Sequence, residues 1–152
     1  MTATKKEMES ALIEELKNNK DYLEALEIVQ SNSKGEIWLI GGIISRSIIK
    51  SIYGYLPLKH DLDFLVEGLN EKLVIPPSWK LAKNWFNNPK LIKGETEIDI
   101  VPLKTAVYID ENKLKPTIKN FLAGTPIDIQ SLAFDIRERK LIGSLGKLGV
   151  FD

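Results

Sequence analysis

The sequence contains no cysteine and only one histidine among its 152 residues. Without cysteine the chain can form no disulfide, use no thiolate nucleophile and bind no zinc through sulfur. We therefore expect any metal site to consist of oxygen ligands, the donors that hard divalent cations prefer. The absence of cysteine also fits the reducing cytoplasm, which is the compartment that we expect.

Excess charge of one sign and long apolar runs are lacking as well. The 21 basic and 21 acidic residues give a formal net charge of +0, and the sequence pI is ≈ 6.6. This balance argues against extended nucleic-acid binding, which needs a broadly basic face. No stretch approaches the roughly 20 apolar residues that cross a bilayer. The segment Met1–Lys20 lacks the apolar core of a signal peptide, so we expect no membrane partner.

The length and the hydrophobic content of 43% predict a single domain over residues 1–152. Its first segment, residues 1–34, has apolar residues at helical spacing between Lys5 and Gln30. Asn18–Lys20 interrupts this pattern. We therefore expect an N-terminal helical segment made of two helices or of one bent helix.

A strand, a glycine turn and a helix follow. Ile37–Ile40 is a short continuous apolar run, typical of a buried strand, and Gly41 and Gly42 end it. Apolar residues then recur along one side of Ile43–Tyr53, which predicts a helix. Glycines at a helix N-terminus let backbone N–H groups approach a phosphate closely, although such a pair is as often a mere tight turn.

Three aspartates are predicted to lie on the polar faces of two strands. Alternation in Asp61–Val66 separates Asp61 and Asp63 from the apolar Leu62 and Phe64. A hairpin over residues 91–101 directs Asp99 away from its two flanking isoleucines in the same way. Carboxylates two residues apart on a strand are about 6.5 Å apart along the chain, close enough to share one or two hard cations. An isolated pair of this kind is otherwise typical of a solvated strand edge.

The segment 67–89 has the weakest secondary-structure pattern in the sequence. Pro76–Pro77 breaks the chain, and Ser78 could begin a short helix. That helix would contain Trp79, Leu81, Ala82, Trp85 and Phe86. The aromatic residues could stack on a nucleobase, but at this spacing they more often fill a core.

The remaining segments are simpler to interpret. Pro116 predicts the start of a short helix that ends near Leu122. Residues 130–136 and 140–143 predict a last hairpin around the solvated turn Arg137–Arg139. His60 could position a phosphate but is more typical of a surface residue, and Asp128 and Asp135 have no assigned role. Together the elements predict an α/β (α+β) fold, a small mixed β-sheet with the acids on one face and helices on the other.

These motifs, in this order, resemble the polymerase-β-type nucleotidyltransferase superfamily. The strongest likeness is to the head domain of tRNA CCA-adding enzymes and bacterial poly(A) polymerases. The matching segments are Ile37–Gly42, His60–Val66, Ile98–Ile100 and Ile127–Asp135, the last continuing through Gly143. Ile127–Asp135 and its continuation are similar to the family's closing motif, usually written D-F-T-I-N-A-L-A-Y. The resemblance implies a palm-like nucleotidyltransferase fold with a catalytic core over residues 36–146.

The resemblance also implies roles for individual residues. Gly41 and Gly42 would touch nucleotide phosphates, Asp61 and Asp63 would bind Mg²⁺ or Mn²⁺, and Asp99 would be the third acid, as a metal ligand or as the base for an acceptor hydroxyl. Two positions depart from the family's G-G-x-x-R-D: here Ser45 replaces the arginine and Arg46 the aspartate. We still assign both to the nucleotide site. The family's R-R-D before the closing motif is replaced by Gly124-Thr125-Pro126.

The predicted function is metal-dependent transfer of a nucleoside monophosphate from an NTP, with ATP expected, to an unidentified acceptor. A small molecule or a protein is favoured over tRNA, since the charge is neutral and the family's tRNA-holding helical domains are not in the sequence. The alternative is a nucleotidyltransferase-like binding module with little or no turnover, such as a toxin partner or a regulatory protein. A homo-oligomer or a protein partner is compatible with either function.

Overall fold

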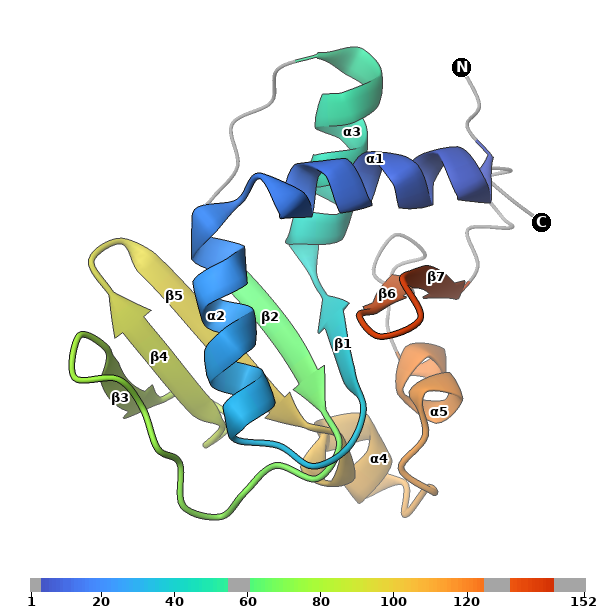
Figure 1. The fold of residues 1–152 in the computed structure, drawn as a ribbon. Helices are drawn as coiled ribbons and strands as arrows, with labels where there is room; N and C mark the ends of the chain where they lie inside the picture. The colour runs from blue at the N-terminus through green and yellow to red at the C-terminus, as the bar shows by residue number, and fades with distance from the viewer. Residues whose placement is uncertain (1–3, 55–60, 125–131, 144–152) are drawn as a thin grey trace.

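The computed structural model describes residues 4–54, 61–124 and 132–143 (Figure 1). Its helices are α1 (Lys5–Lys17), α2 (Lys20–Ser31), α3 (Gly42–Tyr53), the 3-10 helix η1 (Leu103–Thr105), α4 (Val107–Glu111) and α5 (Ile118–Ala123). Its strands are β1 (Ile37–Ile40), β2 (Asp61–Val66), β3 (Lys80–Lys83), β4 (Pro89–Lys93), β5 (Thr96–Pro102), β6 (Leu132–Asp135) and β7 (Lys140–Gly143). Among these helices, none is long and apolar enough to cross a bilayer.

The strands form one mixed seven-stranded sheet in the order β3-β4-β5-β2-β1-β6-β7. Strands β2 and β5 are parallel, and every other pair of neighbours in this sheet is antiparallel. The predicted mixed α/β fold is therefore confirmed. The strand at 37–40, the strand at 61–66 and both predicted hairpins are present, and they contribute six of the seven strands.

The N-terminal segment forms two helices, as expected, because each helix has its own N-cap. Thr4 accepts a hydrogen bond from the backbone of Glu7, whose side chain accepts from the backbone N–H of Thr4 in return. Asn19 then accepts from the backbone N–H of Tyr22 at 2.9 Å and starts α2. The interruption at residues 18–20 is therefore a new helix start.

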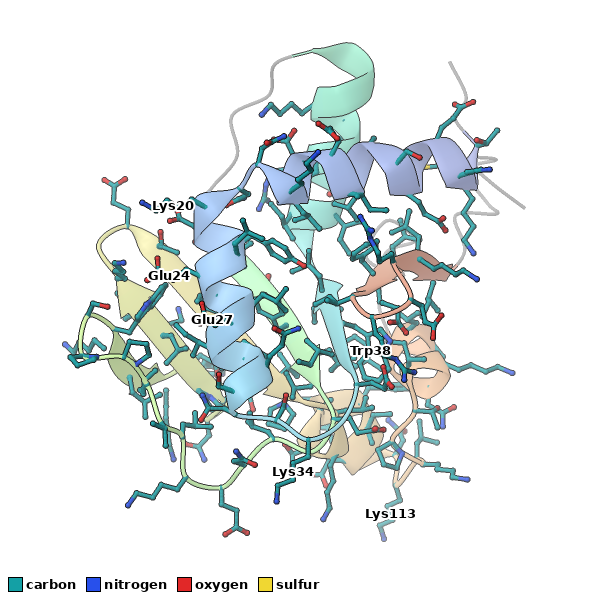
Figure 2. All side chains as sticks on the ribbon, viewed as in Figure 1. Lys20, Glu24, Glu27, Lys34, Trp38 and Lys113 are labelled. Carbon is teal, nitrogen blue, oxygen red and sulfur yellow. The ribbon has the colours of Figure 1, made fainter. Side chains whose placement is uncertain are left out.

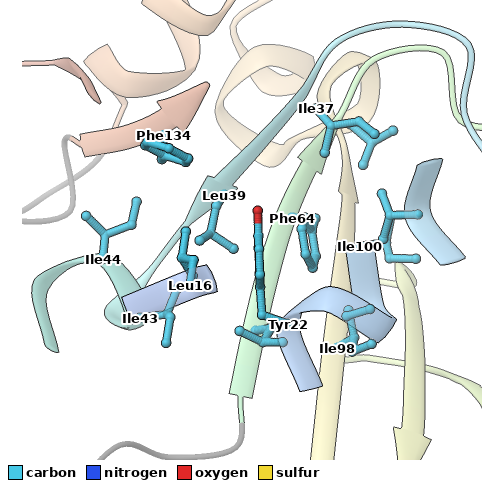
Figure 3. Packing of buried hydrophobic residues seen from close by; sticks show 14 of the residues in the cluster. Leu16, Tyr22, Ile37, Leu39, Ile43, Ile44, Phe64, Ile98, Ile100 and Phe134 are labelled. Atoms are coloured by element: carbon cyan, nitrogen blue, oxygen red, sulfur yellow. The ribbon is translucent and has the colours of Figure 1, made fainter. Parts of the chain in front are cut away.

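The main hydrophobic core lies between the sheet and helices α1, α2 and α3 (Figures 1 and 3). Tyr22 of α2 stacks on Phe64 of β2, with ring centroids 6.2 Å apart and an interplanar angle of 15°. The isoleucines on either side of Asp99 point into this core, as the alternation predicts. The first helical turn after the glycines adds Ile43 and Ile44, so α3 is anchored where it leaves β1.

A second, smaller core lies on the opposite face of the sheet. Trp38 and Leu65 point to this side and pack with Leu103 of η1 and Leu122 of α5. The expectation of helices on one face therefore holds for α1 to α3 but not for the C-terminal helices. Leu65, which alternation places beside the aspartates, is buried because these helices cover that part of the face.

The short helix predicted from Ser78 is wrong. Residues 80–83 form β3, which pairs with β4 in the antiparallel direction. Trp79 is buried, and its Nε1 donates to Glu24, an outward residue of α2 (Figure 2), at 2.9 Å. Trp85 and Phe86 lie in the β3–β4 turn, where they are 94% and 63% exposed. The prediction that these aromatics fill a core is right for Trp79 and wrong for the other two.

Candidate active site

Asp63 and Asp99 lie directly opposite each other on the parallel strands β2 and β5. The strand alternation that sends Leu62, Phe64 and the two isoleucines of β5 into the main core turns both aspartates to the other face. Ile40 of β1 pairs with Asp63, and Lys90 of β4 pairs with Asp99. The two acids thus occupy the centre of the sheet, next to the glycine turn.

The environment of Asp63 disfavours a negative charge. Burial, the carboxylates of Asp99 and Asp61, and a side-chain hydrogen bond with Asp99 raise the pKa of Asp63 from 3.8 to about 6, while Arg46 acts in the opposite direction. Two carboxylates that share a hydrogen bond in a partly buried site repel each other once both are ionised. A cation placed between them would relieve that repulsion.

Asp61 is placed differently from the other two acids. It is the exposed first residue of β2 and pairs with Glu97, two residues along the strand from the Asp63–Asp99 pair. Its charge reaches Asp63, but within the described ranges no group of three His, Cys, Asp or Glu side chains is arranged to hold a metal ion. The structure therefore brings two of the three predicted ligands together, and the three-acid site stays a prediction.

Asn84 orients Asp99, a contact that the sequence analysis missed. Its Nδ2 donates to Oδ1 of Asp99 at 3.2 Å, and its own Oδ1 accepts from the backbone N–H groups of Phe86 and Asn88 at 2.9 and 3.0 Å. One side chain therefore fixes both the β3–β4 turn and the acid. Asparagine is a common turn residue, so the sequence contains a signal for the turn but none for the contact with β5.

Lys90 is the cation on the other side of Asp99. The Asp99 carboxylate raises the pKa of Lys90 above its ordinary value, with a smaller contribution from Glu97. The Nζ of Lys90 forms an ion pair with Glu97 at 3.4 Å. Lys90 therefore stays charged beside the acids and is partly engaged by its neighbour on β5.

The backbone and packing of this site require glycine at position 41, and the guanidinium of Arg46 lies close against Gly42. Gly41 has a φ of +82°, and a Cβ at this position would lie 2.5 Å from Oδ2 of Asp63. A Cβ on Gly42 would collide with the guanidinium of Arg46. The positive φ and the contact with Asp63 explain Gly41 without a ligand. Both glycines stand at the N-terminus of α3, directly beside Asp63 and Arg46.

Ser45 and Arg46 lie on the first turns of α3 and have different surroundings. The hydroxyl of Ser45 donates to the backbone oxygen of Gly42 at 3.1 Å, so it is used within the helix. Arg46 lies against Gly42 and lowers the pKa of Asp63. Its Nε is buried and has no hydrogen-bond partner in the described part of the chain. Arg46 therefore has unused donor capacity beside the carboxylate pair.

A cleft of about 530 Å³ opens beside the two acids. Asp63, Asp99, Asn84 and Asn88 line its polar side. Its other walls come from the β3–β4 turn and from helices α4 and α5, and they include Phe86, Tyr108, Glu111 and Phe121. Sequence reasoning assigned none of the helical residues to a site, because nothing local connects α4 and α5 with the strands that bear the acids.

Other residues considered from the sequence have simpler roles or lie outside the described ranges. Asp135 is buried, and its Oδ1 accepts from the backbone N–H of Glu138 at 2.9 Å, so it stabilises the β6–β7 turn. His60, Asp128, Thr125-Pro126 and the end of the predicted core at 144–146 lie outside the described residues.

The donor set of the acid pair fits a divalent cation such as Mg²⁺ or Mn²⁺. Both donors are hard carboxylate oxygens, they come from adjacent strands in register, and burial together with mutual repulsion disfavours the cation-free state. Sulfur and imidazole donors are lacking among the described residues near the pair. This chemistry favours a cation that binds through oxygen.

No protein-family model matches the chain, and no curated protein matches it either. Two solved structures do align with it. One is a tRNA nucleotidyltransferase complexed with a primer tRNA and an incoming ATP analog, at 18% identity and a TM-score of 0.47, over 75% of this chain and 32% of that one. The other is a tRNA-processing enzyme with CTP, at 16% identity and a TM-score of 0.47, over 75% and 30%. The chain thus spans about a third of the length of these structures.

Proposed function

We propose that this chain transfers a nucleoside monophosphate from an NTP, with ATP as the expected donor, to the hydroxyl of an acceptor other than tRNA. The observation that carries this proposal is the in-register pair Asp63–Asp99 directly beside the Gly41-Gly42 turn. Two carboxylates next to a helix N-terminus would combine a cation site with a phosphate site. That combination matches the needs of nucleotidyl transfer.

Asp63 and Asp99 would hold the cation, and Asp61 would join them as a third ligand. When bound, Mg²⁺ or Mn²⁺ would supply charge neutralisation at the phosphates and would lower the pKa of an attacking hydroxyl. Every ligand in this assignment is a carboxylate of β2 or β5, strands whose inward side chains are locked in the main core.

The phosphates of the donor would lie at the N-terminus of α3. The twelve-residue helix directs the N–H groups of its first turn, and the positive end of its dipole, toward this position. Arg46 supplies the cationic side chain there, with a buried Nε that lacks a partner among the described residues. Ser45 is already engaged with Gly42, so its role is to support the helix start.

The reaction step follows from this arrangement. The hydroxyl oxygen of the acceptor attacks the α-phosphorus and forms a new O–P bond, and the bond from the α-phosphorus to the bridging oxygen breaks. Pyrophosphate leaves with that electron pair. Asp99, positioned by Asn84, accepts the hydroxyl proton and passes it to water.

A second candidate function is a nucleotide-binding module with little or no turnover. It is favoured by the exposed position of Asp61, since within the described chain no three acidic side chains form a metal-holding group. The altered G-G-x-x-R-D segment points the same way. In this alternative the chain would bind NTP and cation without transferring the nucleotide.

The test is to incubate the protein with each of the four α-³²P-labelled NTPs, Mg²⁺ or Mn²⁺ and a cell extract. We expect label from ATP on an acceptor, and we expect EDTA to abolish the transfer. Asp99→Asn should reduce transfer by about 100-fold or more, as the loss of a general base does. Asp110→Asn, an exposed acid outside the cleft, is the matched control and should retain activity.

Nucleotide binding, measured by thermal shift with ATP and Mg²⁺, separates the two candidates. Arg46→Met should abolish the ATP-dependent shift. It should also lower the unliganded melting temperature at neutral pH, because it removes the positive charge that stabilises the ionised Asp63. Binding without label on any acceptor would favour the module. Neither binding nor label with any of the four NTPs would overturn the proposal.

A further inference from the structure

We propose that the cleft beside Asp99 is the acceptor site and that it selects a small aromatic alcohol carrying a cationic group. This inference rests on the proposed function and names the substrate class of the same site. It is carried by the position of the cleft relative to the glycine turn, by its exposed aromatic walls and by the sign of the charges that line it.

The cleft lies on the side of the acids where the attacking hydroxyl must enter. In an in-line displacement the attacking and leaving oxygens occupy opposite sides of the phosphorus. Phosphates at Gly41 and Gly42 would place the leaving pyrophosphate on the β1 side of Asp63. The described residues that line the cleft come from β2, β5, the β3–β4 turn, α4 and α5, and none comes from β1 or α3. The acceptor therefore enters from the cleft.

Two aromatic side chains that line the cleft are much more exposed to solvent than aromatic residues of a hydrophobic core. Phe86 is 63% exposed and Tyr108 is 39% exposed. Asn84 holds the backbone of Phe86 in place, and a Cβ on Gly124 would collide with the ring of Tyr108. The ring of Tyr108 therefore packs against Gly124, and the backbone that carries the Phe86 ring is held in place, while the surfaces of both rings stay partly exposed. Such surfaces favour stacking with a planar ring, and their faces attract cations.

The charges in the cleft disfavour an anionic acceptor. Of the described residues that line it, Asp63, Asp99 and Glu111 are acidic, and none is Lys or Arg. Lys90 lies next to Asp99 outside this lining and is ion-paired with Glu97. A cation bound by the two aspartates would leave Glu111 of α4 as the uncompensated charge of the cleft wall. Glu111 thus favours a positive group on the acceptor and repels phosphate.

Three phenols of one shape test this selectivity. Tyramine, tyrosol and 4-hydroxyphenylacetate share the ring and the hydroxyl and carry a positive, a neutral and a negative end group. Each is titrated into ¹⁵N-labelled full-length protein, and binding is followed at the side-chain amides of Asn84 and Asn88. We expect tyramine to bind about tenfold more tightly than 4-hydroxyphenylacetate, a difference of about 1.4 kcal/mol, with tyrosol between them.

Matched variants assign that preference to residues. Glu111→Gln should bring the affinities of tyramine and tyrosol together, whereas Asp110→Asn, its exposed neighbour outside the cleft, should keep them apart. Phe86→Ala should weaken all three ligands by several-fold, as the loss of about 0.5–1.5 kcal/mol of ring stacking does. Trp85→Ala, 94% exposed and not part of the lining, should leave them unchanged.

The same spectra separate failure of this inference from failure of the proposed function. Nucleotide binding is read at the backbone amides of Gly41 and Gly42 after addition of ATP and Mg²⁺. Suppose that ATP shifts the glycine signals. The inference alone would then be overturned if the three phenols bind equally, if the anionic phenol binds best, or if the phenols shift signals outside the cleft. Tyramine preference without any effect of ATP on the glycines would overturn nucleotidyl transfer and support the ligand class of the cleft.

Discussion

Asp63 faces Asp99 across two parallel strands, and its carboxylate simultaneously occupies the space where a side chain of Gly41 would lie. The acid pair and the glycine turn are therefore one packed unit. Its cost is electrostatic, because burial and the neighbouring carboxylates raise the pKa of Asp63 to about 6. A cation or a proton lowers that cost, which makes the stability of the site dependent on both.

The first prediction concerns pH in the absence of divalent cations. The pKa of Asp63 is raised from 3.8 to about 6 in the folded chain, so the folded state binds its proton more tightly than the unfolded state. The resulting stabilisation is fully present below about pH 4 and is lost as pH rises through about 6, by up to about 3 kcal/mol. In EDTA, Asp63→Asn should therefore exceed wild type in free energy of unfolding at pH 8 and lose most of that advantage at pH 4.

Urea unfolding at the two pH values measures this difference, with Asp110→Asn as a control for removing an exposed acid. Wild type should also gain stability from Mg²⁺ and ATP, by about 2.7 kcal/mol at 100 times the dissociation constant, and Asp63→Asn should not. A destabilised Asp63→Asn at pH 8, with no response of wild type to Mg²⁺, would identify Asp63 as a structural acid.

The parts of the fold that the sequence predicts are those in which the residues of one helix or strand carry the whole pattern. Alternation on β2 and β5 places Asp63 and Asp99 on the polar face, and the asparagines at 18 and 19 mark the helix break. The contact of Asn84 with Asp99 depends on strands from distant parts of the sequence, so no local pattern indicates it. The same holds for the C-terminal helices, whose docking over Leu65 covers a face that alternation leaves polar.

Truncation of the two tryptophans near the β3–β4 turn should change the free energy of unfolding by very different amounts. Trp79 is 7% exposed, and its Nε1 donates to Glu24, so Trp79→Ala should lower the free energy of unfolding by about 3–5 kcal/mol. Trp85 is 94% exposed, so Trp85→Ala should change it by less than about 0.5 kcal/mol. Chemical denaturation of both variants tests this, and similar costs would show that the turn packs differently in solution.

Gly41 should tolerate no side chain, for two separable reasons. Its backbone, with φ +82° and ψ −163°, lies in a region that is essentially restricted to glycine, at a cost of about 1–3 kcal/mol for other residues. A Cβ would in addition lie 2.5 Å from the Asp63 carboxylate. Gly41→Ala should therefore destabilise the chain, and the cost should fall but not vanish in the Asp63→Ala background. A double-mutant cycle by urea unfolding gives both parts, and strict additivity would exclude the contact.

Asn84 provides the last prediction, because one substitution there tests the orientation of Asp99 and the cation site together. Asn84→Asp keeps an oxygen that can accept from the N–H groups of Phe86 and Asn88, so the turn should be retained. It replaces the amide that donates to Asp99 with a second negative charge. In EDTA the added repulsion should lower the free energy of unfolding by on the order of 1 kcal/mol. In Mg²⁺ the same charge should enlarge the stabilisation beyond that of wild type, since a further hard oxygen faces the cation.

The matched control is Asn87→Asp, an exposed position in the same turn with φ 64, where aspartate is well tolerated. Thermal unfolding of the three proteins with and without Mg²⁺ separates the outcomes. An Asn84→Asp protein that behaves like the Asn87→Asp control in both conditions would mean that Asn84 serves the turn alone and that no cation binds beside Asp99.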